Sequence, residues 1–213
     1  MADGPDTVTP ILTPGFDRAE RPHAAHLFWQ AFRGKLGAVL APEDKALSFL
    51  SAALHPDFAI SARDPDGRLL GLAGVKTARG GLVGGGWRDL ARVYGWPGAL
   101  WRGGALSLLE RQVRPDTLLM DGIFVAEDAR GRGVGSALLG AVKARAAEDG
   151  KSSVRLDVID SNPRARALYE RHGFVAGDVT HIGPLHHLFG FRSSTEMHCA
   201  IPAPAPDCRN AAN

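Results

Sequence analysis

The sequence predicts an α/β fold in which a mixed, mostly antiparallel sheet carries helices on both faces. Three observations support this prediction. The chain has 213 residues, 45% hydrophobic and 23% charged, which suits one globular domain. Strand-like and helix-like segments alternate along it. The turn Asp64-Pro65-Asp66-Gly67 lies between two alternating apolar segments, which is typical of a β-hairpin.

The N-terminal half accounts for three strands and two helices. Residues 9–13 are expected to form a first strand. Apolar residues recur at helical spacing over 17–40, and residues 43–54 offer a second helix. The segments 57–63 and 69–77 alternate in hydrophobicity and form the two arms of the hairpin.

The next segment is the least regular part of the chain. A glycine-rich run is followed by two helix-compatible stretches, residues 88–94 and 97–112, and Trp87, Trp96 and Trp101 gather here. We favour a helical pair over the sheet edge with its aromatic residues in the core, because aromatics at helical spacing are usually buried. A mobile lid or a wall of a substrate pocket is the alternative. A membrane-lying helix is disfavoured because the polar face is not rich in lysine.

The C-terminal half alternates more clearly between strands and helices. Pro163 suits the first position of a helix and Gly173 the residue after its end. Residues 1–8 and the Pro/Ala-rich residues 202–213 are expected to be disordered, which leaves a single domain at 9–201. The expected elements are strands at 118–125, from 154 to the Ser161-Asn162 helix start, at 175–181 and at 194–201, and helices at 136–148 and after 163.

A glycine-rich loop joins the strand at 118–125 to the following helix. Glycines let the backbone turn tightly there, and the first helix amides and the helix dipole favour an anion. The loop lacks the lysine of a P-loop and the third glycine of a dinucleotide fingerprint. It fits the pattern Arg/Gln-x-x-Gly-x-Gly/Ala completely, with the residues Arg130, Gly131, Arg132, Gly133, Val134 and Gly135.

A second motif follows in Asn162-Pro-Arg-Ala165-Arg-Ala-Leu168-Tyr169, with Gly173-Phe174 after it. Together the two motifs resemble those of the GNAT-type (general-control-related) N-acyltransferases, over roughly residues 118–176. The resemblance implies the GNAT fold, with residues 79–113 as a helical insertion between its third and fourth strands. It also implies that acetyl-CoA is the co-substrate.

The resemblance further assigns residues to the donor. The pyrophosphate would be held by Arg130, Gly131, Arg132, Gly133, Val134, Gly135 and Ser136. The pantetheine arm would pair with the backbone of Ile123, Phe124 and Val125. Asn162 would also bind that arm, although it equally suits a plain helix N-cap.

The chemistry requires a base for the attacking amine and an acid for the leaving thiolate. By resemblance, Tyr169 is the acid and the backbone amide of Val125 stabilises the developing negative charge. Asp157, twelve residues earlier, is the leading candidate for the base, at a position where ribosomal-protein alanine acetyltransferases carry a glutamate. Pairing with Arg155 or Arg166 would instead make it structural. Asp121, Glu127, His181 and His186 compete with it for the role of base.

Composition excludes several other classes of function. The net charge is only +2 and no long basic run occurs, which argues against nucleic-acid binding. No apolar stretch reaches membrane-spanning length, and no leader-like segment opens the chain. Cys199 and Cys208 form no disulfide framework, so a cytoplasmic protein is expected. Exposed loop positions account for His181, His186 and His187 better than a metal site does, so no metal is expected.

We therefore expect an acetyl-CoA-dependent N-acetyltransferase. Its acceptor would be an amine on a small molecule, a peptide N-terminus or a lysine, and a homodimer stays open. A catalytically idle acyl-CoA-binding or regulatory module is the alternative, and a nucleotide-binding domain a weaker one. Glu20, Glu43, Asp44 and Asp89 could line the acceptor pocket but are too few to indicate a polyamine.

Overall fold

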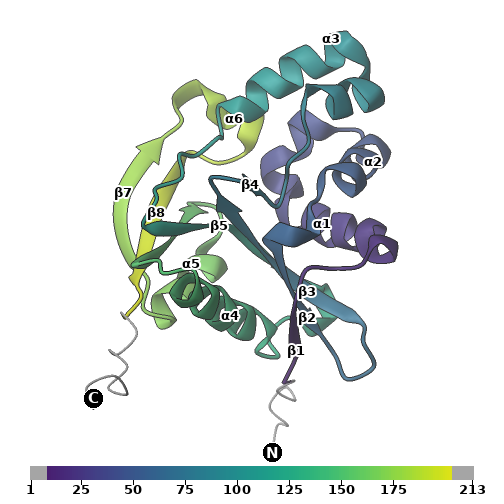
Figure 1. The fold of residues 1–213 in the computed structure, drawn as a ribbon. Coiled ribbons are helices and arrows are strands. Elements are labelled where there is room, and N and C mark those ends of the chain that lie inside the picture. Colours follow the sequence, from purple (N-terminus) through teal and green to yellow (C-terminus); the bar gives the residue numbers. More distant parts are fainter. Residues whose placement is uncertain (1–8, 203–213) are drawn as a thin grey trace, which may run out of the picture.

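In the computed structural model, which describes residues 9–202, eight strands form one sheet in the order β1-β2-β3-β5-β6-β8-β7 (Figure 1). The short β4 pairs with β3 outside this path. Only β5 and β6 run parallel, and all other pairs are antiparallel. The strands are β1 (Ile11–Pro14), β2 (Ala59–Arg63), β3 (Leu69–Thr77), β4 (Gly80–Gly81), β5 (Thr117–Val125), β6 (Ser153–Ile159), β7 (Val175–His181) and β8 (Ser193–Ala200).

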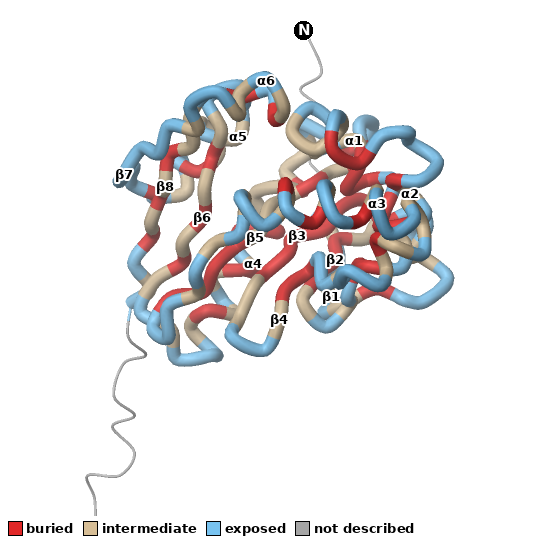
Figure 2. The backbone as a smooth tube through the Cα atoms, turned by 90° about the horizontal axis from the view of Figure 1, so that it is seen from above, coloured by how far each residue is buried: buried red, intermediate tan, exposed pale blue. Residues whose placement is uncertain are grey.

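Helices cover both faces of the sheet, as the sequence predicts. In Figure 1, α1, α2 and α3 lie on one side of the sheet, and α4 and α5 lie on the other. Figure 2 shows the buried positions concentrated in the central strands and on the helix sides that face them. The helices are α1 (Arg21–Leu40), α2 (Glu43–Ala53), α3 (Trp87–Ser107), α4 (Val134–Glu148), α5 (Pro163–Arg171) and the short α6 (His186–Phe189).

The observed helices and strands differ from the predicted ones mainly in where they begin and end. α4 begins at Val134, two residues earlier than predicted, because Gly133 adopts a left-handed conformation and caps the helix. β1 spans residues 11–14, and the terminal segments predicted to be disordered lie outside the described residues, apart from Pro202.

The insertion forms two helical segments that meet at Gly95, where the backbone leaves the helical region (φ 71°, ψ 165°). The prediction that its tryptophans are core residues is wrong: Trp87, Trp96 and Trp101 are 48%, 69% and 46% exposed. The buried positions of α3 are small or aliphatic instead, because the helix packs against α1 and α2. The ring of Trp87 lies against Gly103, where an added Cβ would come within 2.4 Å of it.

The sheet opens between β5 and β6. Their parallel pairing covers only Thr117–Leu119 against Ser153–Arg155. Beyond this point β5 keeps its pairing with β3, and β6 keeps its pairing with β8 as far as Ile159. One edge of β5 therefore has no strand beside it from Met120 to Val125.

Candidate active site

The free edge of β5 presents backbone groups to the opening. Ala126 donates its N–H to the Leu70 carbonyl at 2.8 Å, and Leu72 pairs with Phe124 in the same register. Hydrogen-bonding direction alternates along an antiparallel pair, so Phe124 also points its backbone groups toward β3. Ile123 and Val125 therefore direct theirs into the opening. Arg130 Nε donates to the Val125 carbonyl at 3.2 Å, which leaves the Val125 N–H facing the gap.

The Phe124 side chain has a structural role on the other side of the strand. Its ring packs edge-on against Phe28 and Phe32 of α1, with centroids 5.5 and 6.1 Å away. The sequence predicts that the backbone of Phe124, like that of its two neighbours, binds the pantetheine arm. In the structure its backbone groups face β3 instead, and its side chain packs against α1.

The glycine loop lies at the end of β5 and leads into α4. Gly131 and Gly133 have φ values of 77° and 87°, a region that side chains with a Cβ adopt only with strain. A Cβ at Gly131 would meet nothing within 4 Å, and one at Gly135 would meet only Leu168, at 3.4 Å. The loop is therefore open toward solvent, and the helix amides after Gly133 are free of helical acceptors. These features fit a pyrophosphate.

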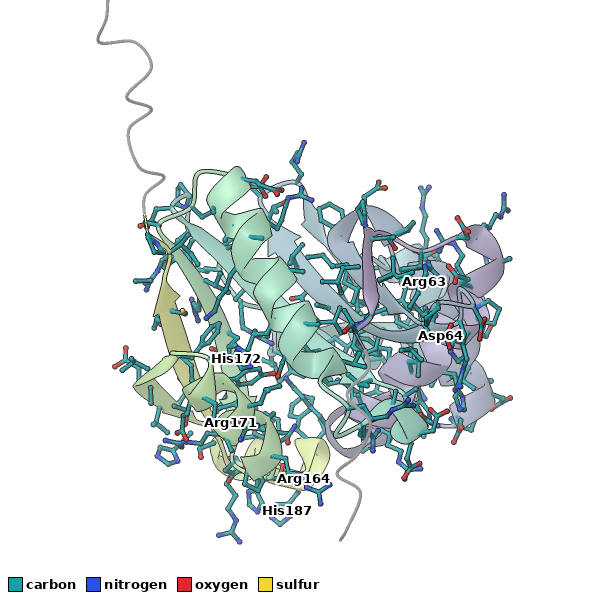
Figure 3. The ribbon with its side chains drawn as sticks, turned by 90° about the horizontal axis from the view of Figure 1, so that it is seen from below. Arg63, Asp64, Arg164, Arg171, His172 and His187 are labelled. Atoms are coloured by element: carbon teal, nitrogen blue, oxygen red, sulfur yellow. The ribbon has the colours of Figure 1, made fainter. Side chains whose placement is uncertain are left out.

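The start of α4 is fixed to α5. Ser136 Oγ lies 3.0 Å from His172 Nε2, and Lys143 Nζ donates to the His172 carbonyl. Burial lowers the pKa of His172, with Lys143 and Arg171 adding to the effect. Figure 3 shows His172 beside α4, with Arg171 near it and Arg164 at the other end of α5. These contacts hold the loop and the second motif in one rigid arrangement.

An inner pocket of about 470 Å³ lies where β5 and β6 part. Tyr169 lines it from α5, and burial raises the pKa of its phenol to about 12, so the phenol keeps its proton throughout the physiological range. Asn162 lines the pocket as well, and its Oδ1 accepts from the Ala165 N–H at 3.1 Å as an N-cap. The cap leaves the side-chain Nδ2 of Asn162 without a partner among the described residues.

Two carboxylates lie in this pocket. Asp157 is ion-paired, with Oδ2 3.0 Å from Arg111 Nε and Oδ1 3.8 Å from Arg155 Nη2. Asp121 lies at a β-bulge, since Gly74 pairs with Gly122 and Val75 with Met120, which leaves Asp121 opposite no residue. The Leu82 N–H donates to Asp121 Oδ2 at 3.3 Å, and burial raises the pKa of this carboxyl.

An outer pocket of about 360 Å³ adjoins the inner one. The two share four lining residues, Phe32, Lys35, Arg111 and Asp121. The remaining walls of the outer pocket are largely apolar and come from α1 and the insertion, including Phe28, Leu36, Trp87, Leu90, Leu106 and Leu109. The insertion therefore forms a pocket wall, which is the alternative to the core interpretation that the sequence leaves open.

Lys35 and Arg111 are the site residues that sequence reasoning misses. Lys35 lies seven residues after Phe28 and three after Phe32, on the apolar face of the predicted helix, so a lysine within an apolar stripe is the available signal. Arg111 falls in the segment predicted to be helical but lies beyond the end of α3, where nothing in the sequence indicates that it turns inward.

The other candidates lie elsewhere. Glu127, His181 and His186 line neither pocket, and the same holds for Glu20, Glu43, Asp44 and Asp89. Among residues 9–202, no three His, Cys, Asp or Glu side chains are placed to share a metal ion. Within the same range, no helix is long and apolar enough to cross a bilayer.

Comparison with known proteins agrees with this geometry. The model of the acetyltransferase (GNAT) family matches residues 21–174. A search of curated proteins finds no match.

Solved acetyltransferase structures share the fold at low sequence identity. The histone acetyltransferase HPA2 and related acetyltransferase from Corynebacterium glutamicum is 20% identical, with a TM-score of 0.61 over 92% of this chain and 98% of that one. A GCN5-related N-acetyltransferase from Kribbella flavida is 22% identical, with a TM-score of 0.58 over 90% and 97%. A phosphinothricin acetyltransferase from Sinorhizobium meliloti, solved with acetyl-CoA, is 15% identical, with a TM-score of 0.58 over 96% and 95%.

Proposed function

Because this chain belongs to the GNAT family of acetyltransferases, whose donor is acyl-CoA, we propose that it transfers an acetyl group from acetyl-CoA to a primary amine by direct attack in a ternary complex. One observation carries the proposal above all: the sheet opens after Leu119, with the glycine loop at the end of β5 and Tyr169 inside. This arrangement would place a phosphate site and a proton donor along the same free strand edge.

The donor would lie along that edge. The backbone groups of Ile123 and Val125 would pair with the pantetheine amides, and the Asn162 side-chain amide could donate to the same arm. The pyrophosphate would meet the amides of Val134, Gly135 and Ser136 at the start of α4. Arg130 and Arg132 would add positive charge beside them.

Acetyl-CoA supplies a thioester, an acyl group already activated toward amines. We assign removal of the amine proton to Asp121 rather than to Asp157. Asp121 lies where the two pockets meet, and burial raises its pKa toward the operating pH, which suits a general base. Asp157 is neutralised by Arg111 and would act as a positioning residue. The base assignment to Asp157 stays a prediction that can be tested beside this one.

Tyr169 would donate its proton to the leaving sulfur. Its high pKa makes positioning more important than acidity, and Arg111 is the group whose charge favours the phenolate once the proton has left. The Val125 N–H, directed into the opening, would stabilise negative charge on the carbonyl oxygen.

The test combines binding with turnover. Acetyl-CoA is titrated into the protein by calorimetry, and a library of amines is screened for free thiol release. Micromolar binding with amine-dependent thiol release supports the proposal. Binding without release on any small amine or peptide would favour the idle module, and absence of binding would contradict the donor site itself.

A further inference from the structure

Lys35 is a half-buried cation that forms no ion pair within residues 9–202. It lines both pockets, and among the described residues no carboxylate lies within 4.0 Å of its ammonium. Its Nζ lies 5.5 Å from the centroid of the Phe191 ring. Burying a charge is costly unless it is paired, so an unpaired lysine inside a pocket indicates that a partner comes with a ligand.

Arg111 adds a second unsatisfied donor beside it. Its Nε is paired with Asp157, but its Nη1 is buried without a hydrogen-bond partner among residues 9–202. A guanidinium donates in a fixed planar fork that matches a carboxylate. Arg111 also lines both pockets, so its side chain and Lys35 border the same space.

The charged side chains that line the two pockets balance in the free protein, with three cations against three carboxylates, so an acceptor that brings only an ammonium leaves one positive charge in excess. Arg111 is neutralised by Asp157, and Lys76 on the outer wall is paired with Glu110 at 3.4 Å. Asp121 is the remaining carboxylate, and as the proposed base it faces the ammonium of the acceptor. The positive charge of Lys35 then has no counter-charge in the pockets, and one negative charge on the acceptor would balance it.

The rest of the outer pocket limits the acceptor in size and polarity. Its volume of about 360 Å³ is near the lower end of ligand pockets and suits a small molecule better than a peptide segment. Aromatic and aliphatic side chains form most of its walls, so the remainder of the acceptor should be apolar.

Resting on the proposed function, we propose that the acceptor is a free α-amino acid, or a close analogue, with an apolar side chain. Its amino group lies against Asp121, its carboxylate is held by Lys35 and the free Nη1 of Arg111, and its side chain occupies the apolar outer pocket. Peptide N-termini and protein lysines lack a carboxylate at this distance from the reacting amine.

The test compares each apolar amino acid with the amine that lacks only its carboxylate. Phenylalanine is paired with phenethylamine and leucine with isopentylamine, and thiol release gives kcat and KM for each. We expect kcat/KM to favour the amino acid by about ten-fold or more in at least one pair, the size typical of losing a charged hydrogen-bonded contact. Equal or better use of the amines in every pair would overturn the proposal and leave the transferase function standing.

A binding measurement keeps the test decisive if turnover is slow. N-acetylphenylalanine and N-acetylphenethylamine are titrated into the CoA-loaded protein by calorimetry. Tighter binding of the acid supports the proposal, and equal binding or none overturns it. Failure of the protein to bind CoA at all would instead contradict the proposed function, so the two failures are distinguishable.

Two variants assign the effect to Lys35. Lys35→Met keeps the length of the side chain and removes its charge, and Lys45→Met is the matched control on the exposed surface of α2. Lys35→Met should raise KM for the amino acid about ten-fold or more with little change in kcat, whereas KM for the matched amine should not rise. Lys45→Met should alter neither. An equal loss of kcat on both acceptors would mean that Lys35 acts on the reaction rather than on the carboxylate, and would overturn the assignment.

Discussion

Replacing Lys35 with methionine should stabilise the free protein near neutral pH, although it removes a charged group from the site. Burial, with a contribution from the charge of Arg111, lowers the pKa of Lys35 from 10.5 to about 8, while Asp157 and Asp121 partly oppose this. At about 1.4 kcal/mol per pKa unit, the folded protein loses about 3 kcal/mol by keeping this lysine charged. Relaxation around a real buried charge reduces this figure, so we expect a gain of about 1–3 kcal/mol in the variant.

The stability gained by Lys35→Met should depend on pH, because the pKa of Lys35 differs between the folded and the unfolded protein. The unfolded chain holds the lysine proton up to pH 10.5 and the folded protein only up to about 8. The penalty is therefore complete below pH 8 and disappears as the pH rises through 10.5. The advantage of Lys35→Met should be largest at pH 7 and shrink by pH 10.

The assay is urea unfolding of the wild type, Lys35→Met and Lys45→Met at pH 7 and pH 10. Lys45 is exposed, so its replacement should change the free energy of unfolding by no more than about 0.5 kcal/mol at either pH. If Lys35→Met is no more stable than the wild type at pH 7, or if its advantage is the same at both pH values, then the ammonium is satisfied in the free protein. The argument for a missing anion would then lose its basis.

The remaining predictions concern the donor and the proton transfers. Tyr169→Phe should lower kcat about 100-fold in the thiol-release assay with little change in the calorimetric Kd for acetyl-CoA, and unchanged turnover would remove the acid assignment. Asp121→Asn should lower kcat/KM by a similar factor of about 100 and abolish its rise with pH, whereas Asp157→Asn should leave the shape of the pH profile intact; the reverse result would return the base to Asp157. Gly133→Val should destabilise the fold by about 1–2 kcal/mol in urea and weaken acetyl-CoA binding at least about ten-fold, and wild-type affinity in a folded variant would exclude the loop as the phosphate site.

The strand and helix pattern of this fold is largely readable from the sequence, because each element carries its own local signal. Backbone preferences of single residues determine three of these signals: the hairpin turn, Pro163 at the start of α5 and the glycine loop before α4. The edges of elements are less predictable, since Gly133 can end a loop or begin a helix and only tertiary contacts decide between them.

Asp121 is among the candidate bases that the sequence offers, but its meeting with Lys35 and Arg111 on the acceptor side of the site could not be predicted, for a physical reason. Lys35, Arg111 and Asp121 are separated by many residues, and only the packing of α1 and the segment after α3 against the bulge of β5 brings them together. The prediction that the tryptophans are buried is wrong for a related reason. Helical spacing indicates which residues share a face, but not whether another element covers that face.

The opening of the sheet has a consequence for how the molecule holds together. β1, β2, β3 and β5 form one set of paired strands and β6, β8 and β7 another, and the strand pairing between the two sets covers only three residue pairs. A donor seated between them would supply the missing hydrogen bonds and act in place of a strand. The two sets of strands should therefore unfold more cooperatively with acetyl-CoA than without it, and the amide hydrogens of Ile123 and Val125 should exchange rapidly with solvent until it binds.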